Sequence, residues 1–118
     1  MYDYQNSIEE WMPIPEFPNY SVSYAGRIRN DDYDRLLSPA HTNNGGLYVG
    51  MSKGGRQYKR YLPLLVADAF VEAQTGYEPD LEYNTPLHID GDKMNCRASN
   101  LIWATRTQAI LHHKDMKG

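Results

Sequence analysis

The sequence has little cysteine, no long apolar run and no excess of positive charge. Its single cysteine, Cys96, cannot form an internal disulfide, and there is no cysteine cluster to hold zinc, so we expect a reducing compartment. No apolar stretch approaches the length of a membrane span. The first residues, MYDYQNSIEE, lack the basic and apolar regions of a signal peptide. We therefore expect a cytoplasmic protein without a membrane partner.

The charge balance weighs against a dedicated DNA binder without excluding one. The formal net charge is -3 and the pI is about 5.7, whereas such proteins usually carry a basic face. Local patches matter more than the sum of charges. The 118 residues, 41% of them hydrophobic, suit one compact domain or two very small modules. Ten tyrosines supply apolar area with a polar tip, which fits a thin core or a contact surface.

The N-terminal segment EEWMPIPEFPNYSVSYAGRIRN is rich in proline and aromatic residues. Its three prolines, at positions 13, 15 and 18, exclude a helix. The alternating run YSVSYAGRIRN predicts a short strand, a turn at Ala25-Gly26 and a second short strand over Arg27–Arg29.

A hairpin is predicted for GLYVGMSKGGRQYKRYLPL, because two β-rich runs flank the turn-forming SKGG. Its second strand is the most basic stretch of the chain, with Arg56, Lys59 and Arg60 interleaved with Tyr58 and Tyr61. Two interpretations stay open. The basic side chains protect a solvated edge strand, or they face the phosphates of DNA.

A helix is predicted for LLVADAFVEAQTGY, with Leu65, Ala69 and Ala73 recurring at helical spacing beside Phe70 and with Gly76 as its C-terminal stop. The last third of the chain reads as two strands and a helix. The first strand ends near His88, and the second covers Leu101–Ala104, where Trp103 is expected in the core.

The final helix is predicted to begin at Thr105, because Gln108 follows three residues later and completes a capping box. Ile110 and Leu111 are expected to face inward. Lys114 and Lys117 suit the C-terminal end of this helix.

Three stretches together carry a resemblance to a known family. HIDGDKMNCRASNLIWAT resembles the core of HNH endonucleases of the phage homing type. EEWMPIPEFPNYSVSYAGRIRN resembles the small modular domain that often precedes such nucleases, and YLPLLVADAF resembles their linking helix. The stretches occur in the family's order and cover most of the chain.

The resemblance implies an α+β fold with two parts. A nuclease-associated, β-rich module is expected over residues 1–55. A ββα-metal (HNH-like) domain, which includes the linking helix, is expected over residues 56–118. A phage origin and the cytoplasm of a host bacterium follow from the same resemblance.

The resemblance also assigns roles to individual residues. His88 takes the position of the general base that removes a proton from the attacking water. Asn100 takes the position that orients this base, and Asp90 and Gly91 keep the turn between them. Mg²⁺ or a similar divalent cation would stabilise the scissile phosphate and the leaving oxygen.

The positions of the metal ligands depart from the family. Leu87 and Ala109 stand where the resembling enzymes carry their ligands, and neither offers a lone pair to a hard cation. Pro63 and Leu64 replace the His and Arg of the linking helix. The metal ligands are therefore unknown. Asp90 and His112 are weak candidates.

Several of these residues also have purely structural interpretations. Asn100 can be an Asx-turn residue before a strand, and Asp90 and Asp92 can serve an Asp-Gly turn that needs no metal. His112 and His113 can be the solvated end of a terminal helix.

Two functions remain. The first is an HNH endonuclease that nicks DNA with a divalent cation. The second is a catalytically dead member of the fold that binds DNA, or binds and inhibits a host protein. The resemblance favours the first function. The residues Leu87, Ala109 and Pro63 and the acidic balance favour the second, because electrostatic stabilisation of the phosphate is the major catalytic contribution. We therefore expect an HNH-endonuclease-like phage protein whose metal site is degenerate.

Overall fold

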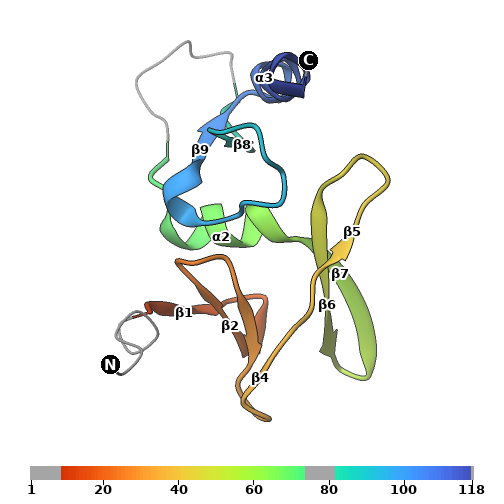
Figure 1. The fold of residues 1–118 in the computed structure, drawn as a ribbon. Helices are drawn as coiled ribbons and strands as arrows, with labels where there is room; N and C mark the ends of the chain where they lie inside the picture. The colour runs from red at the N-terminus through yellow and green to blue at the C-terminus, as the bar shows by residue number, and fades with distance from the viewer. Residues whose placement is uncertain (1–8, 74–81, 118) are drawn as a thin grey trace, which may run out of the picture.

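The computed structural model describes residues 9–73 and 82–117, and these have an α+β arrangement (Figure 1). Strands form three small antiparallel sheets. Helix α2 crosses the middle of the molecule, with the N-terminal strands on one side and β8 and β9 on the other, and α3 lies at the far end. This confirms the expected fold class. Within the described residues no helix is long and apolar enough to cross a membrane.

The N-terminal sheet has four strands in the order β1-β2-β3-β4: β1 (Trp11–Ile14), β2 (Phe17–Ser23), β3 (Ile28–Asn30) and β4 (Arg35–Leu36). The predicted strand–turn–strand is confirmed, although the second strand begins one residue later than expected. At the turn, Gly26 has a φ of 89°, which an L side chain rarely adopts. A Cβ there would also lie 2.7 Å from the carbonyl oxygen of Cys96.

The second sheet contains the predicted hairpin. Its strands are β5 (Ala40–His41), β6 (Leu47–Lys53) and β7 (Arg56–Tyr61). Gly54 and Gly55, with φ values of 58° and 78°, supply the two positive φ angles that a tight type I′ hairpin turn needs. The expected domain division between residues 55 and 56 falls in this turn, so β6 and β7 pair across it. The division stays a prediction.

Helix α2 (Leu62–Phe70) is shorter and begins earlier than predicted. Pro63 lies in its first turn, where a missing N–H costs nothing. The helix ends because Val71 is extended, with φ -98° and ψ 127°. The predicted stop, Gly76, lies outside the described residues.

Leu65 and Ala69, whose helical spacing predicted the helix, pack against the main core without lying on the most buried face of α2. Leu62, Val66 and Ala67 are fully buried, whereas Leu65 and Ala69 are only partly so. The reason is the position of α2, which contacts the N-terminal sheet, the β6–β7 hairpin and the β8–β9 hairpin. Which stripe is covered depends on those neighbours and not on helical spacing alone.

The C-terminal unit comprises β8 (Thr85–His88), the 3₁₀ turn η1 (Ala98–Asn100), β9 (Leu101–Ala104) and α3 (Arg106–Lys117). The predicted capping box is present. The Thr105 N–H donates to Gln108 Oε1 at 3.0 Å, and the Gln108 N–H donates to Thr105 Oγ1 at 3.1 Å. The predicted start of the last helix and the predicted ββα order are therefore confirmed.

The prediction that Ile110 and Leu111 face inward is wrong, since each is 54% exposed. Ala109 is buried instead, and His113 follows it by one turn on the same side of α3. Among the described strands, β8 is the one that α3 contacts closely. Only a narrow face of α3 is therefore covered. The side chains of Lys114 and Lys117 lie outside the described residues.

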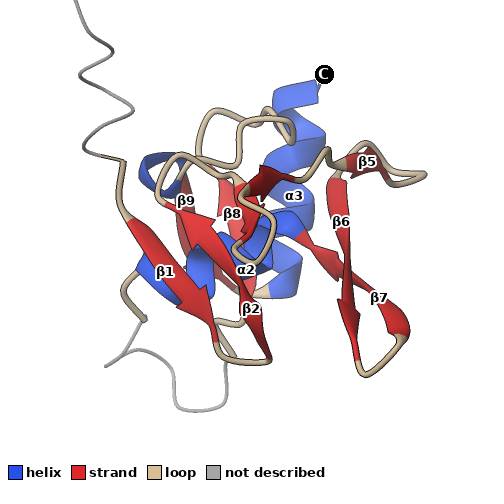
Figure 2. Ribbon diagram, turned by 90° about the horizontal axis from the view of Figure 1, so that it is seen from below, coloured by secondary structure: helices blue, strands red, loops and turns tan. Residues whose placement is uncertain are grey.

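One main core joins the N-terminal strands to the segment around β9. Figure 2 shows these elements gathered around α2. The core contains residues from the N-terminal sheet, β6, α2, the loop and turn before β9, and the first residue of β9: Ile14, Phe17, Tyr20, Val22, Ile28, Leu47, Val49, Met51, Leu62, Val66, Cys96, Ala98 and Leu101. The Ala98 N–H donates to the Tyr24 carbonyl at 2.9 Å. Trp103, predicted in the core, is half-buried, and its Nε1 donates to the Val71 carbonyl at 3.1 Å.

Candidate functional site

The β8–β9 hairpin brings His88 and Asn100 together. Strand β8 ends at His88, which pairs with Leu101, and the Ile89 N–H donates to the Asn100 carbonyl at 2.8 Å. Helix α3 packs against β8. His88 thus lies at the end of β8 and Asn100 in the turn just before β9, beside each other across the hairpin. Their catalytic roles stay predictions.

The Asn100 side chain is buried and holds the turn after β8. Its Nδ2 donates to Asp90 Oδ1 and to the Asn95 carbonyl, each at 2.9 Å, and its Oδ1 accepts the Asp90 N–H at 3.1 Å. Both amide hydrogens are therefore used by the loop. The geometry favours the structural interpretation of Asn100, and any effect on His88 passes through the turn that follows it.

Asp90 is the hub of this loop. Its carboxylate accepts hydrogen bonds from Asn95 Nδ2 at 2.9 Å, from the Asp92 N–H at 2.8 Å and from Asn100. These hydrogen bonds, that from Asn95 first, lower the pKa of the Asp90 carboxyl. Three donors already converge on the carboxylate, which supports the turn interpretation over a metal ligand.

The ring of His88 is fully enclosed, with 0% of the residue exposed. Its Nδ1 lies 3.0 Å from Nε2 of His113, and its Nε2 lies 3.8 Å from Sγ of Cys96. Burial, with His113 close by, lowers the pKa of His88 to about 4. The imidazole is therefore neutral at pH 7, which is the form that a general base needs.

His113 lies against the Nδ1 edge of His88. The backbone N–H of His88 donates to Nε2 of His113 at 3.2 Å, and the same nitrogen lies 3.0 Å from Nδ1 of His88. Which of the two ring nitrogens donates depends on the tautomer of each imidazole. His113 also hydrogen-bonds the backbone of Ala109, and burial lowers the pKa of His113.

Sequence reasoning missed His113 and Cys96 as neighbours of the expected base. It interpreted His112 and His113 as a solvated helix end, which is wrong: both are half-buried, and His112 Nε2 lies 3.0 Å from the Ile89 carbonyl. The spacing of His113 from Ala109, one helical turn, was the available signal. Burial raises the pKa of the Cys96 thiol to about 12, so Cys96 is a core thiol and not a nucleophile.

The positions expected to hold a divalent cation lie in an apolar cluster. Leu87 and Ala109 are 8% and 3% exposed and pack with Ala104. HNH nucleases use divalent metal ions, and such hard cations take oxygen ligands, which neither residue has. Across residues 9–73 and 82–117, no three His, Cys, Asp or Glu side chains are grouped to hold an ion. The side chains of Leu87 and Ala109 therefore do not fit a divalent cation.

The basic residues of β7 do not form one surface. Side chains alternate along a strand, so Arg56 and Arg60 point to one face and Lys59 to the other. Lys59 Nζ lies 5.0 Å from the Tyr48 ring centroid. Arg60 donates to both carboxylate oxygens of Glu16, at 3.0 and 2.6 Å. Whether the three residues contact DNA stays a prediction.

Two family descriptions match separate parts of the chain. The NUMOD4 motif matches residues 9–52, and the HNH endonuclease family matches residues 71–111. The first match covers the N-terminal sheet and most of β6. The second contains His88, Asn100 and the start of α3.

Named relatives and a solved structure agree with these matches. The chain is 32% identical over 98 residues to DNA endonuclease I-HmuI of Bacillus phage SP01, covering 82% of this chain and 53% of the relative. It is 26% identical over 96 residues to the uncharacterized HNH endonuclease L247 of Acanthamoeba polyphaga mimivirus, covering 81% of this chain and 23% of the relative. The structure titled DNA binding and cleavage by the HNH homing endonuclease I-HmuI superposes with a TM-score of 0.73 at 28% identity. It covers 92% of this chain and 59% of the solved one, so this chain spans only part of each protein.

Proposed function

Because the chain belongs to the HNH endonuclease family, with a NUMOD4 motif ahead of its HNH unit, we propose that it binds DNA and has lost efficient metal-dependent nicking. We place this activity in the cytoplasm of a host bacterium. The observation that carries the proposal is the apolar cluster of Leu87, Ala104 and Ala109. It fills the positions where the family's cation ligands are expected.

The loss of the metal ligands should lower the rate of DNA nicking more than the affinity for DNA. In this family a divalent cation, when bound, stabilises the charge of the scissile phosphate and the leaving oxygen. The residues of this chain that remain are a neutral, enclosed His88 and a turn held by Asn100 and Asp90. They can orient a base but supply no positive charge to the phosphate. Removing one such electrostatic contribution typically costs about 10² to 10³ in rate.

DNA binding is supported by different residues. Lys59 and Arg56 are exposed on the β6–β7 hairpin, whereas Arg60 is held by Glu16. The net charge of -3 makes such local patches the main source of attraction for phosphates. The related endonuclease I-HmuI is described as binding and cleaving DNA, which supports the same substrate class here.

A working nickase is the competing candidate, and the intact turn favours it. His88, Asp90, Gly91 and Asn100 keep the family's residue types and lie together. An inhibitor of a host protein remains the third interpretation, drawn from the sequence alone.

The decisive experiment measures binding and nicking on the same preparation. Supercoiled plasmid is incubated with Mg²⁺, Mn²⁺ or EDTA, and a gel-shift titration is run in parallel. We expect salt-sensitive DNA binding and a nicking rate no higher than that of His88→Ala. Brisk nicking that requires the ion and disappears in His88→Ala would overturn the loss of activity. Absence of any gel shift at low salt would overturn the DNA-binding part.

A further inference from the structure

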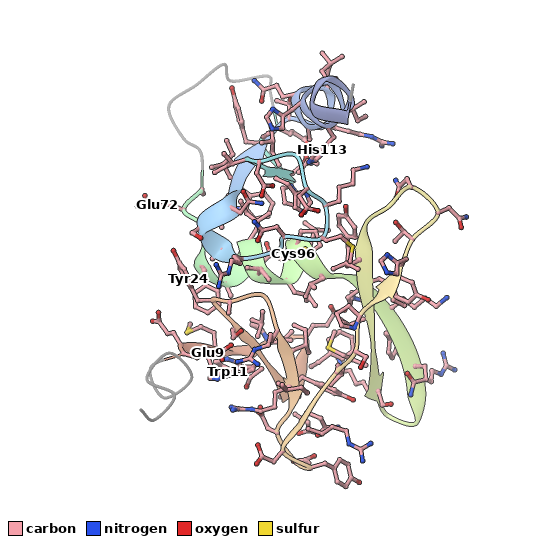
Figure 3. All side chains as sticks on the ribbon, viewed as in Figure 1. Glu9, Trp11, Tyr24, Glu72, Cys96 and His113 are labelled. Carbon is pink, nitrogen blue, oxygen red and sulfur yellow. The ribbon has the colours of Figure 1, made fainter. Side chains whose placement is uncertain are left out.

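The imidazole ring of His88 has one neighbour at each nitrogen, and the two neighbours differ in how deeply they are buried. On the Nε2 side, Cys96 is 4% exposed and belongs to the main core. On the Nδ1 side, the only ring in hydrogen-bonding contact within the described part of the chain is that of His113, which is half-buried. Figure 3 shows the two neighbours: His113 projects from α3, and Cys96 lies deeper, in the loop next to α2. Of the two neighbours of the His88 ring, His113 is therefore the nearer to solvent.

We infer that His113 is a removable cap over Nδ1 of His88, which closes the expected catalytic base to water and to phosphate until the His113 ring moves away. The inference rests on the proposed function only where it takes His88 as the base of the site. Closure of the His88 ring to solvent does not depend on whether the chain cleaves DNA.

Helix geometry explains why His113 can reach this position. Side chains on a helix lean toward its N-terminus, so a residue covers the surface over the preceding turn. The residue one turn earlier is Ala109, whose methyl group is buried against Leu87. A larger side chain at 109 would occupy the space that the His113 ring crosses. Ala109 leaves it free, and the ring also hydrogen-bonds the backbone of Ala109.

The contacts that hold the cap are few. Nε2 of His113 accepts the backbone N–H of His88 and lies 3.0 Å from Nδ1 of His88. The nearby apolar residues of α3, Ile110 and Leu111, are each 54% exposed. Segments with few buried apolar contacts open at lower free energy than the core does. The cap side of His88 therefore opens before the Cys96 side.

Chemical labelling of histidine tests the cap directly. Folded protein is treated with diethyl pyrocarbonate, which acylates accessible neutral imidazole, and modification at each histidine is followed by mass spectrometry. His41 is exposed and serves as the internal reference. In the wild type we expect His88 to react at least about tenfold more slowly than His41, because reaction must wait for local opening.

Two variants separate the cap from general loosening. In His113→Ala, His88 should react within a few-fold of His41. In His113→Gln the side chain keeps similar reach and an acceptor, so His88 should stay protected. Thermal melts followed by circular dichroism check that both variants are folded. If His113→Ala does not fold, His113→Ser, which also removes the ring, takes its place in the same labelling experiment.

The outcomes distinguish the cap from the nuclease. His88 reacting as fast as His41 in the wild type overturns the cap, as does continued protection of His88 in folded His113→Ala or His113→Ser. Faster labelling of His88 without any nicking by His113→Ala supports the cap and counts against a latent nuclease. Faster labelling together with new metal-dependent nicking supports both.

Discussion

Asn100 holds Asp90 and not His88. The Asn100 amide donates to the Asp90 carboxylate at 2.9 Å and accepts the Asp90 backbone N–H at 3.1 Å. The pair closes the loop between β8 and β9 as one unit, and the Gly91 N–H donates to the His88 carbonyl at 2.9 Å within it. The position of the expected base is thus set by a turn that Asn100 holds from η1, just before β9.

Replacing Asn100 by alanine should destabilise the fold by about 2–3 kcal/mol, because three hydrogen bonds of a buried side chain are lost together. Asn95→Ala is the matched control, since that side chain donates one hydrogen bond to the same Asp90, and we expect it to cost about 1 kcal/mol or less. Urea denaturation measures both. Equal midpoints for the two variants would contradict the bracing role of Asn100.

Stability should depend on pH through His88. Its pKa is about 4 in the folded protein, below the ordinary value of 6.5. Between these values the unfolded chain binds a proton that the folded chain does not, so the free energy of unfolding falls as pH decreases. The full contribution is present above pH 6.5, and up to about 3 kcal/mol is lost by pH 4.

The measurement is the urea midpoint between pH 7 and pH 4. His88→Gln should flatten this decline, whereas His41→Gln, a substitution of an exposed histidine in β5, should leave it unchanged. A decline that persists in full in His88→Gln would assign the acid sensitivity to other groups.

Two glycines with the same φ provide a test of how the N-terminal turn docks. Gly26 and Gly45 both have a φ of 89°. A Cβ at Gly26 would meet the Cys96 carbonyl oxygen at 2.7 Å, whereas a Cβ at Gly45 would meet nothing within 4 Å. Gly45→Ala should cost only the backbone strain, about 1–2 kcal/mol. Gly26→Ala should cost at least about 2 kcal/mol more, because backbone must shift. Thermal melts that give equal losses would place the Gly26 turn away from Cys96.

The features that sequence predicted well are those encoded within a few residues. The turn at Gly54-Gly55 and the capping box of Thr105 and Gln108 each need only local backbone chemistry. The same is true of the end of β8 at His88, which is marked by the Asp-Gly turn that follows.

The features that sequence missed depend on partners far away in the chain. Ile110 and Leu111 were expected to face inward because they are apolar. Strand β8 instead covers the side of α3 that carries Ala109 and His113. The contact between His113 and His88 joins residues 25 positions apart. Periodicity does not specify that contact, because it carries no information about distant partners. The family pattern does not specify it either, because the position it marks on the helix is Ala109 and not His113.

DNA affinity should separate the three basic residues of β7. Arg56→Ala and Lys59→Ala should each weaken binding and lower the slope of log affinity against log salt by about 1, as expected for one lost phosphate contact. Arg60→Ala should have a smaller effect, because Glu16 already neutralises its guanidinium. Glu16→Gln should strengthen binding by freeing Arg60. Fluorescence anisotropy at several salt concentrations measures this. A loss confined to Arg60→Ala would reverse the assignment.

Restoring the family's ligands should first cost stability. Leu87→Asp places a carboxylate in the apolar cluster with Ala104 and Ala109, which without an ion should destabilise the protein by about 2–4 kcal/mol. Ala109→Asn adds bulk where the His113 ring crosses the helix. The single variant Leu87→Asn is the control, because it adds a polar group of similar size without a charge.

A divalent cation should then reverse the loss in the double variant Leu87→Asp with Ala109→Asn. An ion that binds only the folded state at about one hundred times its Kd stabilises that state by about 2.7 kcal/mol. We therefore expect Mn²⁺ to raise the Tm of the double variant and to leave the wild type and Leu87→Asn almost unchanged. One ligand seldom holds a hydrated hard cation, so each single ligand variant should respond less than the pair. If calorimetry detects tight Mn²⁺ binding by the wild type, other residues hold the ion. That result would contradict the proposed loss of metal-dependent nicking.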